Sequence, residues 1–300
     1  MGKSDGDWRA FMQYLPIRLL LWIALKLPYE RRVRFVGHVT ARWIAPIAGW
    51  HRRIALNLAH VCPELSNDEV RRLQRAVPDN AGRSLIESFS GAEFVERTRD
   101  TPLSGPGLAP FLSARAAGRP VIFVTAHFGN YLVARAVLHA RDHQLAGFYR
   151  PMRNRWFNSR YVAALREIGE PLFASDRKGT LGFVKHLAGG GIIALLIDVY
   201  TIKGAKLTFF GKSAPTAPAA AEWALRYGAL VVPIYGIRQP DGLSFEVVLD
   251  APIEHTAPEQ MTQELNDSLE KQVREHMHQW FWIHRRWAKS PEQLGEAESP

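Results

Sequence analysis

The chain has 300 residues, one cysteine and a formal net charge of +9, with a pI near 9.8. This length suffices for one large domain, or for one domain with an appendage. The single Cys62 excludes an internal disulfide framework and any multi-cysteine zinc site. The basic balance suits nucleic acid, anionic lipid or an acidic protein partner.

Basic residues alternate with aromatic ones near both ends of the chain, in RLLLWIALKLPYERRVRF and QWFWIHRRWAK. Tryptophan beside Arg or Lys is typical of a membrane interface, and the interleaving argues against a nucleic-acid partner. The alternative is that the tryptophans belong to the core and the arginines to a solvated face. We expect a membrane surface as partner, contacted by Trp22, Trp43, Trp282, Arg285 and Arg286.

The first part of the chain is predicted to be helical. Helical spacing covers residues 8 to 60, with breaks at Pro28 and around 46–49, and a further helix is expected over 68–77, capped by Ser66 and Asn67. The apolar stretch 14–27 falls short of the roughly 20 residues of a spanning helix. We therefore favour a helix that lies in the membrane interface, with a short, tilted spanning anchor as the alternative.

Strands and helices alternate from residue 119 onward, after the Pro- and Gly-rich stretch TPLSGPGLAP (101–110), which is predicted to be a linker. Strands are expected at 121–125, 145–150, 171–175, 192–198, 229–238 and 244–250, the last at an edge. This alternation predicts an α/β fold with a mixed, mostly parallel sheet flanked by helices. The last ten residues are expected to be disordered.

Three polar side chains follow predicted strands: His127, Arg150 and Asp198. In open α/β sheets, sites form beyond the carboxyl ends of strands, so a base, a cation and a carboxylate would face one crevice. Gly129 and Asn130 then begin a helix, whose free N–H groups would suit an oxyanion or a phosphate. A histidine that takes a proton from an alcohol beside such donors is the minimum apparatus for acyl transfer without a covalent enzyme intermediate.

Four blocks in order carry a family resemblance: TAHFGN, FYRPMRNRWFN, the long block from LIDVYTIKGAKLTFFG to PIYGIR, and QWFWIHRRWAKSPE. Over roughly residues 10 to 290, the chain resembles the bacterial lipid A lauroyl and myristoyl acyltransferases of the lysophospholipid acyltransferase superfamily. On this basis residues 1–100 would be a membrane-associating helical region and residues 101–290 the acyltransferase domain.

The resemblance implies an enzyme on the cytoplasmic face of the cell inner membrane. It would transfer a fatty acyl chain from acyl carrier protein, or from coenzyme A, to a hydroxyl of a lipid A precursor or other anionic lipid, without a metal or cofactor. His127 would be the general base. The substrates would be bound by Gly129, Asn130, Arg150, Arg153, Asn154, Phe210, Gly211 and Thr216.

The chain departs from the family's His-x4-acid motif, because Leu132 stands where the acid belongs. A leucine cannot orient the imidazole, and loss of an orienting carboxylate costs a few powers of ten in rate. Another acid could substitute, with Asp198 the first candidate and Glu222 a weaker one. The alternatives are a weak or inactive membrane-binding homologue and a replacement peculiar to this sequence. A lysophospholipid-type acyltransferase is a further alternative for the function.

The remaining histidines include His276, His278 and His284, which lie close together in the sequence. A His-x-His pair can bind metal, but no carboxylate or cysteine nearby completes a ligand set, so no metal site is expected.

Overall fold

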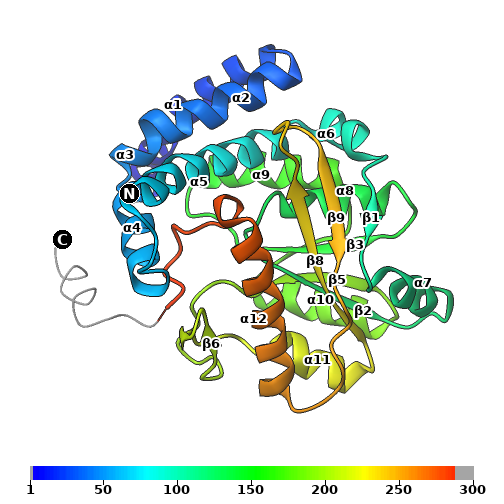
Figure 1. Ribbon diagram of the computed structural model, residues 1–300. Helices are drawn as coiled ribbons and strands as arrows, with labels where there is room; N and C mark the ends of the chain where they lie inside the picture. Colours follow the sequence, from blue (N-terminus) through cyan, green and yellow to red (C-terminus); the bar gives the residue numbers. More distant parts are fainter. Residues whose placement is uncertain (1–2, 288–300) are drawn as a thin grey trace.

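The computed structural model describes residues 3–287, with side chains from residue 8 (Figure 1). The tail that was expected to be disordered, residues 291–300, lies outside the described residues. The N-terminal helices are α1 (Lys3–Lys26), α2 (Tyr29–Val39), the π-helix η1 (Thr40–Ile44), α3 (Ala45–Ile47), α4 (Trp50–Val61), α5 (Asn67–Ser88) and α6 (Gly91–Thr98). The later helices are α7 (Leu108–Ala116), α8 (Tyr131–His139), α9 (Arg155–Ile168), α10 (Arg177–Ala188), α11 (Ala219–Tyr227), α12 (Pro258–Glu275) and the 3-10 helix η2 (Met277–Gln279).

A seven-stranded sheet in the order β1-β9-β8-β2-β5-β3-β4 forms the centre of the molecule. Its strands are β1 (Leu103–Ser104), β2 (Val121–Thr125), β3 (Leu145–Tyr149), β4 (Leu172–Ala174), β5 (Ile192–Leu196), β8 (Leu230–Arg238) and β9 (Phe245–Leu249). β8 and β9 pair antiparallel and every other pair is parallel. The expected α/β class, with a mixed, mostly parallel sheet flanked by helices, is therefore confirmed.

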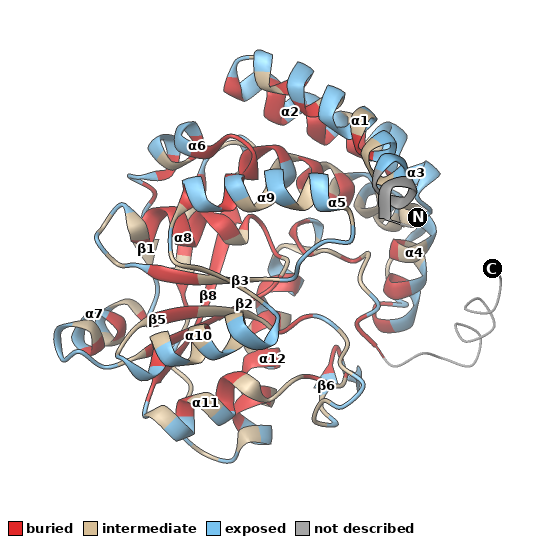
Figure 2. Cartoon of the chain, turned by 180° about the vertical axis from the view of Figure 1, so that it is seen from behind, coloured by how far each residue is buried: buried red, intermediate tan, exposed pale blue. Residues whose placement is uncertain are grey.

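Both faces of the sheet are covered, which explains why β2 is a continuous apolar run (Figure 2). Val121 and Phe123 belong to a core shared with α7 and α8, whereas Ile122 and Val124 belong to one shared with α10, α11 and α12. Because side chains alternate along a strand, each layer of helices takes every second residue of β2.

Outside the main sheet, β6 (Thr208–Phe209) and β7 (Lys212–Ser213) form a small antiparallel hairpin. Two local expectations need correction. The predicted linker contains β1, which pairs with β9, so β9 is not the edge strand. The helix expected to end at Val77 instead continues through Pro78 to Ser88, because its later turns are packed against the N-terminal helices. Gly82 permits this close packing, since a Cβ there would lie 2.4 Å from Thr40 Oγ1.

A buried ion pair joins α5 to the sheet. Arg238 at the end of β8 donates to both carboxylate oxygens of Glu87, over 2.6 and 2.7 Å, and the Glu87 side chain is fully buried. Glu87 also accepts a hydrogen bond from Asn130 Nδ2, and Arg238 Nε donates to Asn80 Oδ1. The charge pair thus holds the start of α8, next to His127, against α5 and β8.

Arg238→Met is expected to lower the free energy of unfolding by about 3–5 kcal/mol, because it leaves the Glu87 carboxylate buried and unpaired. Denaturant unfolding followed by circular dichroism measures the loss. The double variant Arg238→Met/Glu87→Met should be more stable than the single one. A double variant that is less stable than Arg238→Met would contradict this account.

Candidate active site

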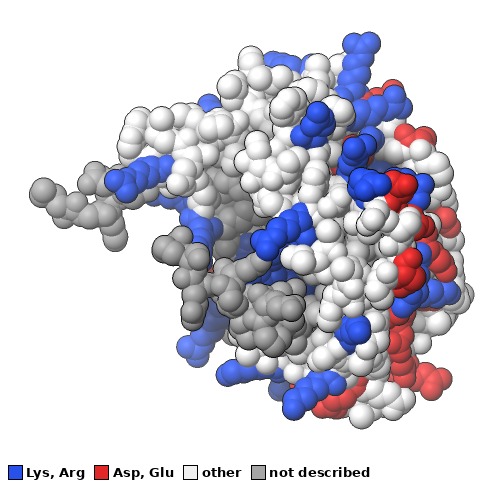
Figure 3. All heavy atoms as spheres, turned by 60° about the vertical axis from the view of Figure 1, so that its left-hand side comes forward, with Lys and Arg blue, Asp and Glu red and all other residues white. Residues whose placement is uncertain are grey.

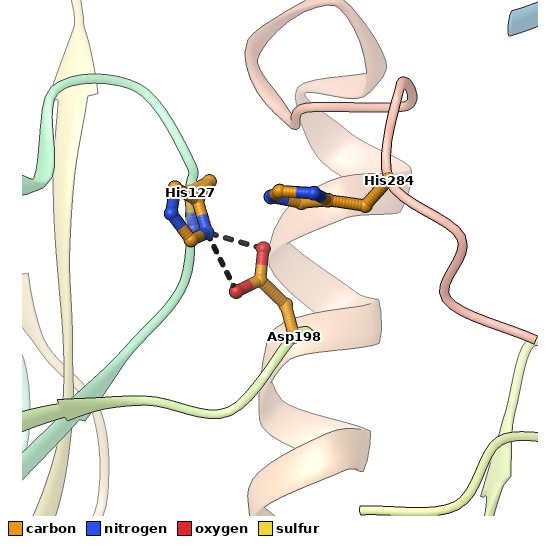
Figure 4. Close-up of side chains that lie close together, drawn as sticks. All are labelled: His127, Asp198 and His284. Atoms are coloured by element: carbon orange, nitrogen blue, oxygen red, sulfur yellow. Dashed lines mark hydrogen bonds and ion pairs between the residues drawn. The ribbon is translucent and has the colours of Figure 1, made fainter. Parts of the chain in front are cut away.

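The parallel pairing of β2 and β5 brings His127 and Asp198 together. Thr125 and Leu196 are partners in the register, and His127 and Asp198 each follow two residues later. The His127 Nδ1 lies 2.9 Å from Asp198 Oδ1, and the His127 backbone N–H donates to Oδ2 over 2.9 Å (Figure 4). Because a carboxylate only accepts, Nδ1 carries the proton and Nε2 is the nitrogen left for a substrate.

The Asp198 carboxylate is fully buried, and its third donor is Trp280 Nε1, 3.1 Å from Oδ2. Burial alone would raise the pKa of Asp198, but the neighbouring His127 and His284 and the hydrogen bonds from His127 hold the pKa well below its usual range. The side chain therefore remains ionised at neutral pH and accepts hydrogen bonds with both oxygens.

Leu132, at the position of the motif acid, is 7% exposed and belongs to the core formed with α8. Glu222, the weaker substitute considered, is an exposed residue of α11. Asp198 is thus the candidate acid that the structure places within hydrogen-bond distance of His127.

The N–H groups of Gly129 and Asn130, expected to be free for a ligand at the start of α8, are engaged by the protein itself. The Gly129 N–H donates to the Gln279 carbonyl over 2.9 Å and the Asn130 N–H to the Gly236 carbonyl over 3.0 Å. The Asn130 side chain, as the N-cap, accepts from the Leu132 N–H. These N–H groups are hydrogen-bonded because β8 and the C-terminal segment pack directly on this loop. The approach is so close that a Cβ at Gly129 would lie 1.9 Å from the Gly236 carbonyl oxygen.

Two cavities meet at His127. The larger, about 460 Å³, is lined by apolar side chains of β3, β5, α8 and α9 and by Arg150. The smaller, about 160 Å³, lies between the start of α8, α5 and the C-terminal segment. His127, Tyr131, Leu132 and Tyr161 line both cavities. A reacting group beside His127 would therefore have mostly apolar space on two sides.

The block around Arg150 is divided between the larger cavity and the helix that follows. Arg150 is exposed and lines the cavity, whereas Arg153 is exposed in the loop before α9. Asn154 caps α9 by accepting from the Trp156 and Phe157 N–H groups. Its Nδ2 donates to the Ala10 carbonyl over 2.6 Å, so Asn154 also attaches α1 to the α/β core.

Phe210 and Thr216, expected to shape a substrate site, are buried under the C-terminal segment. Phe210 is 4% exposed and Thr216 is 0% exposed, whereas Gly211 is exposed. Arg286 donates to Thr216 Oγ1 over 2.8 Å. Phe210 and Thr216 thus present almost no surface to a ligand, because the segment after η2 covers them.

The residues expected to contact lipid fall into two groups. Trp22 and Trp43 are 59% and 60% exposed, and Arg285 is also exposed. Trp282 and Arg286 are fully buried, so the expectation of lipid contact is wrong for both. The Trp282 ring belongs to an aromatic core with Trp280, and Trp282 Nε1 donates to the Met277 carbonyl. Within residues 3–287, no helix is both long and apolar enough to cross a membrane.

The C-terminal segment contributes two side chains that sequence reasoning missed as members of this site. Trp280 binds Asp198, and the His284 ring centroid lies 4.5 Å from that of His127. Both residues occur in the block QWFWIHRRWAKSPE, which was the available signal. The contacts of Trp280 with Asp198 and of His284 with His127 join chain segments more than 80 residues apart, and no local pattern encodes them.

Comparisons with known proteins identify the family of the chain. Residues 8–289 match the family described as Bacterial lipid A biosynthesis acyltransferase. The chain is also 23% identical over 283 residues to the Lipid A biosynthesis lauroyltransferase of Escherichia coli (strain K12), with 91% of this chain and 90% of that protein covered. The chain therefore belongs to the bacterial lipid A biosynthesis acyltransferase family.

Proposed function

We propose that this protein transfers a fatty acyl chain from acyl carrier protein, or from coenzyme A, to a hydroxyl group of a lipid A precursor. The observation that carries the proposal is the pair formed by His127 and the buried Asp198, at the junction of two largely apolar cavities. It also supports an account of Leu132, in which Asp198 performs the orienting role of the missing motif acid.

In the proposed reaction, His127 Nε2 accepts the proton of the acceptor hydroxyl as its oxygen attacks the thioester carbon. Asp198 stabilises the imidazolium that forms. The tetrahedral intermediate then expels the thiolate, which takes the proton from His127. Since the N–H groups of Gly129 and Asn130 are engaged, we assign the oxyanion to the hydroxyls of Tyr131 and Tyr161, which line both cavities. Burial raises the pKa of both phenols, so they stay protonated as donors.

The larger cavity suits the acyl chain. Phe148, Leu165, Leu172 and Leu195 line it, and it begins at His127. Burial of methylene groups against such walls stabilises binding by about 0.8 kcal/mol each. Arg150 on the cavity and Arg153 beyond it supply positive charge for a phosphate of the donor or acceptor.

The net positive charge of the chain supports acyl carrier protein as the acyl donor. The chain has 38 Lys and Arg against 29 Asp and Glu. Figure 3 shows Lys and Arg spread over one face, with the acidic side chains gathered toward its right-hand margin. An acidic carrier would be steered to such a surface.

The proposed location is the cytoplasmic face of the inner membrane, reached through α1. This helix packs Tyr14, Leu21 and Ala24 inward, yet its other side exposes apolar residues: Trp8, Met12, Leu19, Trp22 and Ile23. A helix that is apolar on both sides needs a second apolar partner. Trp43 and Ile47 are likewise exposed, on η1 and α3.

His127→Ala is expected to lower kcat for acyl transfer by about 10²–10⁴-fold, because it removes the general base. Asp198→Asn should cost a similar factor by favouring the wrong imidazole tautomer. Transfer of labelled acyl groups from acyl carrier protein to a lipid A precursor measures both variants. Full activity in His127→Ala would refute the proposed mechanism, and a wild-type chain inactive with either donor would favour the non-catalytic alternative.

Leu132→Asp is expected to lower activity rather than raise it. The new carboxylate would be buried in an apolar wall, while Asp198 already holds His127 Nδ1. The same assay measures the effect, with Leu132→Asn as the uncharged control of equal shape. A rate gain that is specific to Leu132→Asp would mean that Asp198 does not replace the motif acid.

The double variant Trp22→Ser/Trp43→Ser is expected to bind vesicles containing anionic lipid several-fold more weakly, because it removes two exposed aromatic anchors. Flotation with vesicles measures the bound fraction. Leu181→Ser is the matched control, since Leu181 is 71% exposed but lies on α10. Equal losses in both variants would argue against α1 and η1 as the membrane contact.

A further inference from the structure

The Asp198 carboxylate has one acceptor position that no donor among residues 8–287 fills. Its two oxygens offer about four lone-pair positions. Oδ2 accepts from the His127 backbone N–H and from Trp280 Nε1, whereas Oδ1 accepts from His127 Nδ1 alone among the described residues. A carboxylate as deeply buried as that of Asp198 gains from each further protein donor, because burial removes it from bulk water.

His284 lies beside this open position. Its backbone carbonyl accepts from Asn57 Nδ2 over 3.0 Å, which anchors the segment on α4. In Figure 4 the imidazole of His284 points at His127 and Asp198. One ring nitrogen of His127, one of His284 and a carboxylate oxygen of Asp198 all lie within 4.8 Å of one another.

The Nε2 of His284 is buried and has no hydrogen-bond partner among the described residues. Burial lowers the pKa of His284 to about 4, against the opposing effect of Asp198, so the ring is neutral at physiological pH. A neutral imidazole has one N–H and one lone pair. Facing an anionic oxygen, the tautomer with the proton on Nε2 is favoured, since a lone pair there would be repelled.

We propose that His284 is a positioning residue, whose Nε2–H serves as the fourth donor to Asp198 and so fixes the carboxylate against His127. This role in catalysis rests on the proposed function, but the contact itself does not. A nitrogen of His284 already lies within 4.8 Å of a carboxylate oxygen of Asp198. The C-terminal segment would then supply, through Trp280 and His284, half of the donors that hold the acid.

The charged and titratable groups around Asp198 come from several elements. They are His127 after β2, Tyr131 on α8, and His284 and Arg286 on the C-terminal segment. Two of these groups have a buried nitrogen without a hydrogen-bond partner among the described residues, His284 Nε2 and Arg286 Nε. The two NH groups of Arg286 donate to Pro215, Thr216 and Asn266, whereas the His284 ring points at the carboxylate in Figure 4. Removing its N–H would leave more negative charge on Oδ1 for the hydrogen bond from His127, which should strengthen.

His284→Phe and His284→Gln form the matched pair that tests the inference. Phe keeps a planar ring without a donor, and Gln keeps an N–H donor. The readout without substrate is the downfield proton resonance of His127 Nδ1–H in the full chain, assigned by its loss in His127→Ala. We expect the resonance to move further downfield in His284→Phe and to return toward the wild-type position in His284→Gln. A chelator in every sample removes any divalent metal that could bridge the three groups.

Acyl transfer by the same proteins gives the second readout. We expect kcat to fall about tenfold in His284→Phe with KM little changed, the acid limb of the pH–rate profile to move to higher pH, and Gln to restore most of the rate. An unmoved resonance, or an equal shift in both variants, overturns the inference. His284→Leu replaces His284→Phe if that variant does not fold. If the resonance shifts as expected but the wild-type chain transfers no acyl group, the proposed function fails and the positioning contact stands.

Discussion

The carboxylate of Asp198 is the charge around which the candidate site is built. It lies in a dry interior, where an ion costs several kcal/mol unless donors surround it. Those donors come from the loop after β2 and from the segment after η2, while Asp198 itself follows β5. The hydrogen bonds to this one buried charge therefore orient His127 and hold the C-terminal segment on the sheet. The covered Asp198 carboxylate is not exposed to solvent.

A second buried charge fixes the same loop from the other side. Glu87 binds both Arg238 and the N-cap residue Asn130, and the Gly129 carbonyl accepts from Asn80 and Ser84 of α5. The loop that carries His127 thus lies between an ion pair on α5 and β8 and the Asp198 carboxylate. This rigidity also explains why its backbone N–H groups are not available to a ligand.

The replacement of the motif acid by leucine fits this arrangement. Asp198 contacts Nδ1 from the end of the neighbouring strand, and in the proposed mechanism it takes the orienting role, so that position 132 can be apolar. Leu132 then contributes to the walls of both cavities. The polar residues of the site follow β2 and β5 or belong to the C-terminal segment. In the first turn of α8, Leu132 and Val133 pack in the core beside Tyr131.

The sequence by itself determined the α/β class, most strand positions and the strand-end residues His127, Arg150 and Asp198, because alternation and apolar runs report local periodicity and parallel strands end at a common edge. It also carried the family blocks. Tertiary structure alone decided that Gly129 and Asn130 donate to neighbouring backbone, that Trp282 and Arg286 are buried, and that His284 adjoins His127. Those features depend on how the C-terminal segment packs on the sheet, and a contact between segments distant in the sequence leaves no periodic signal in either of them.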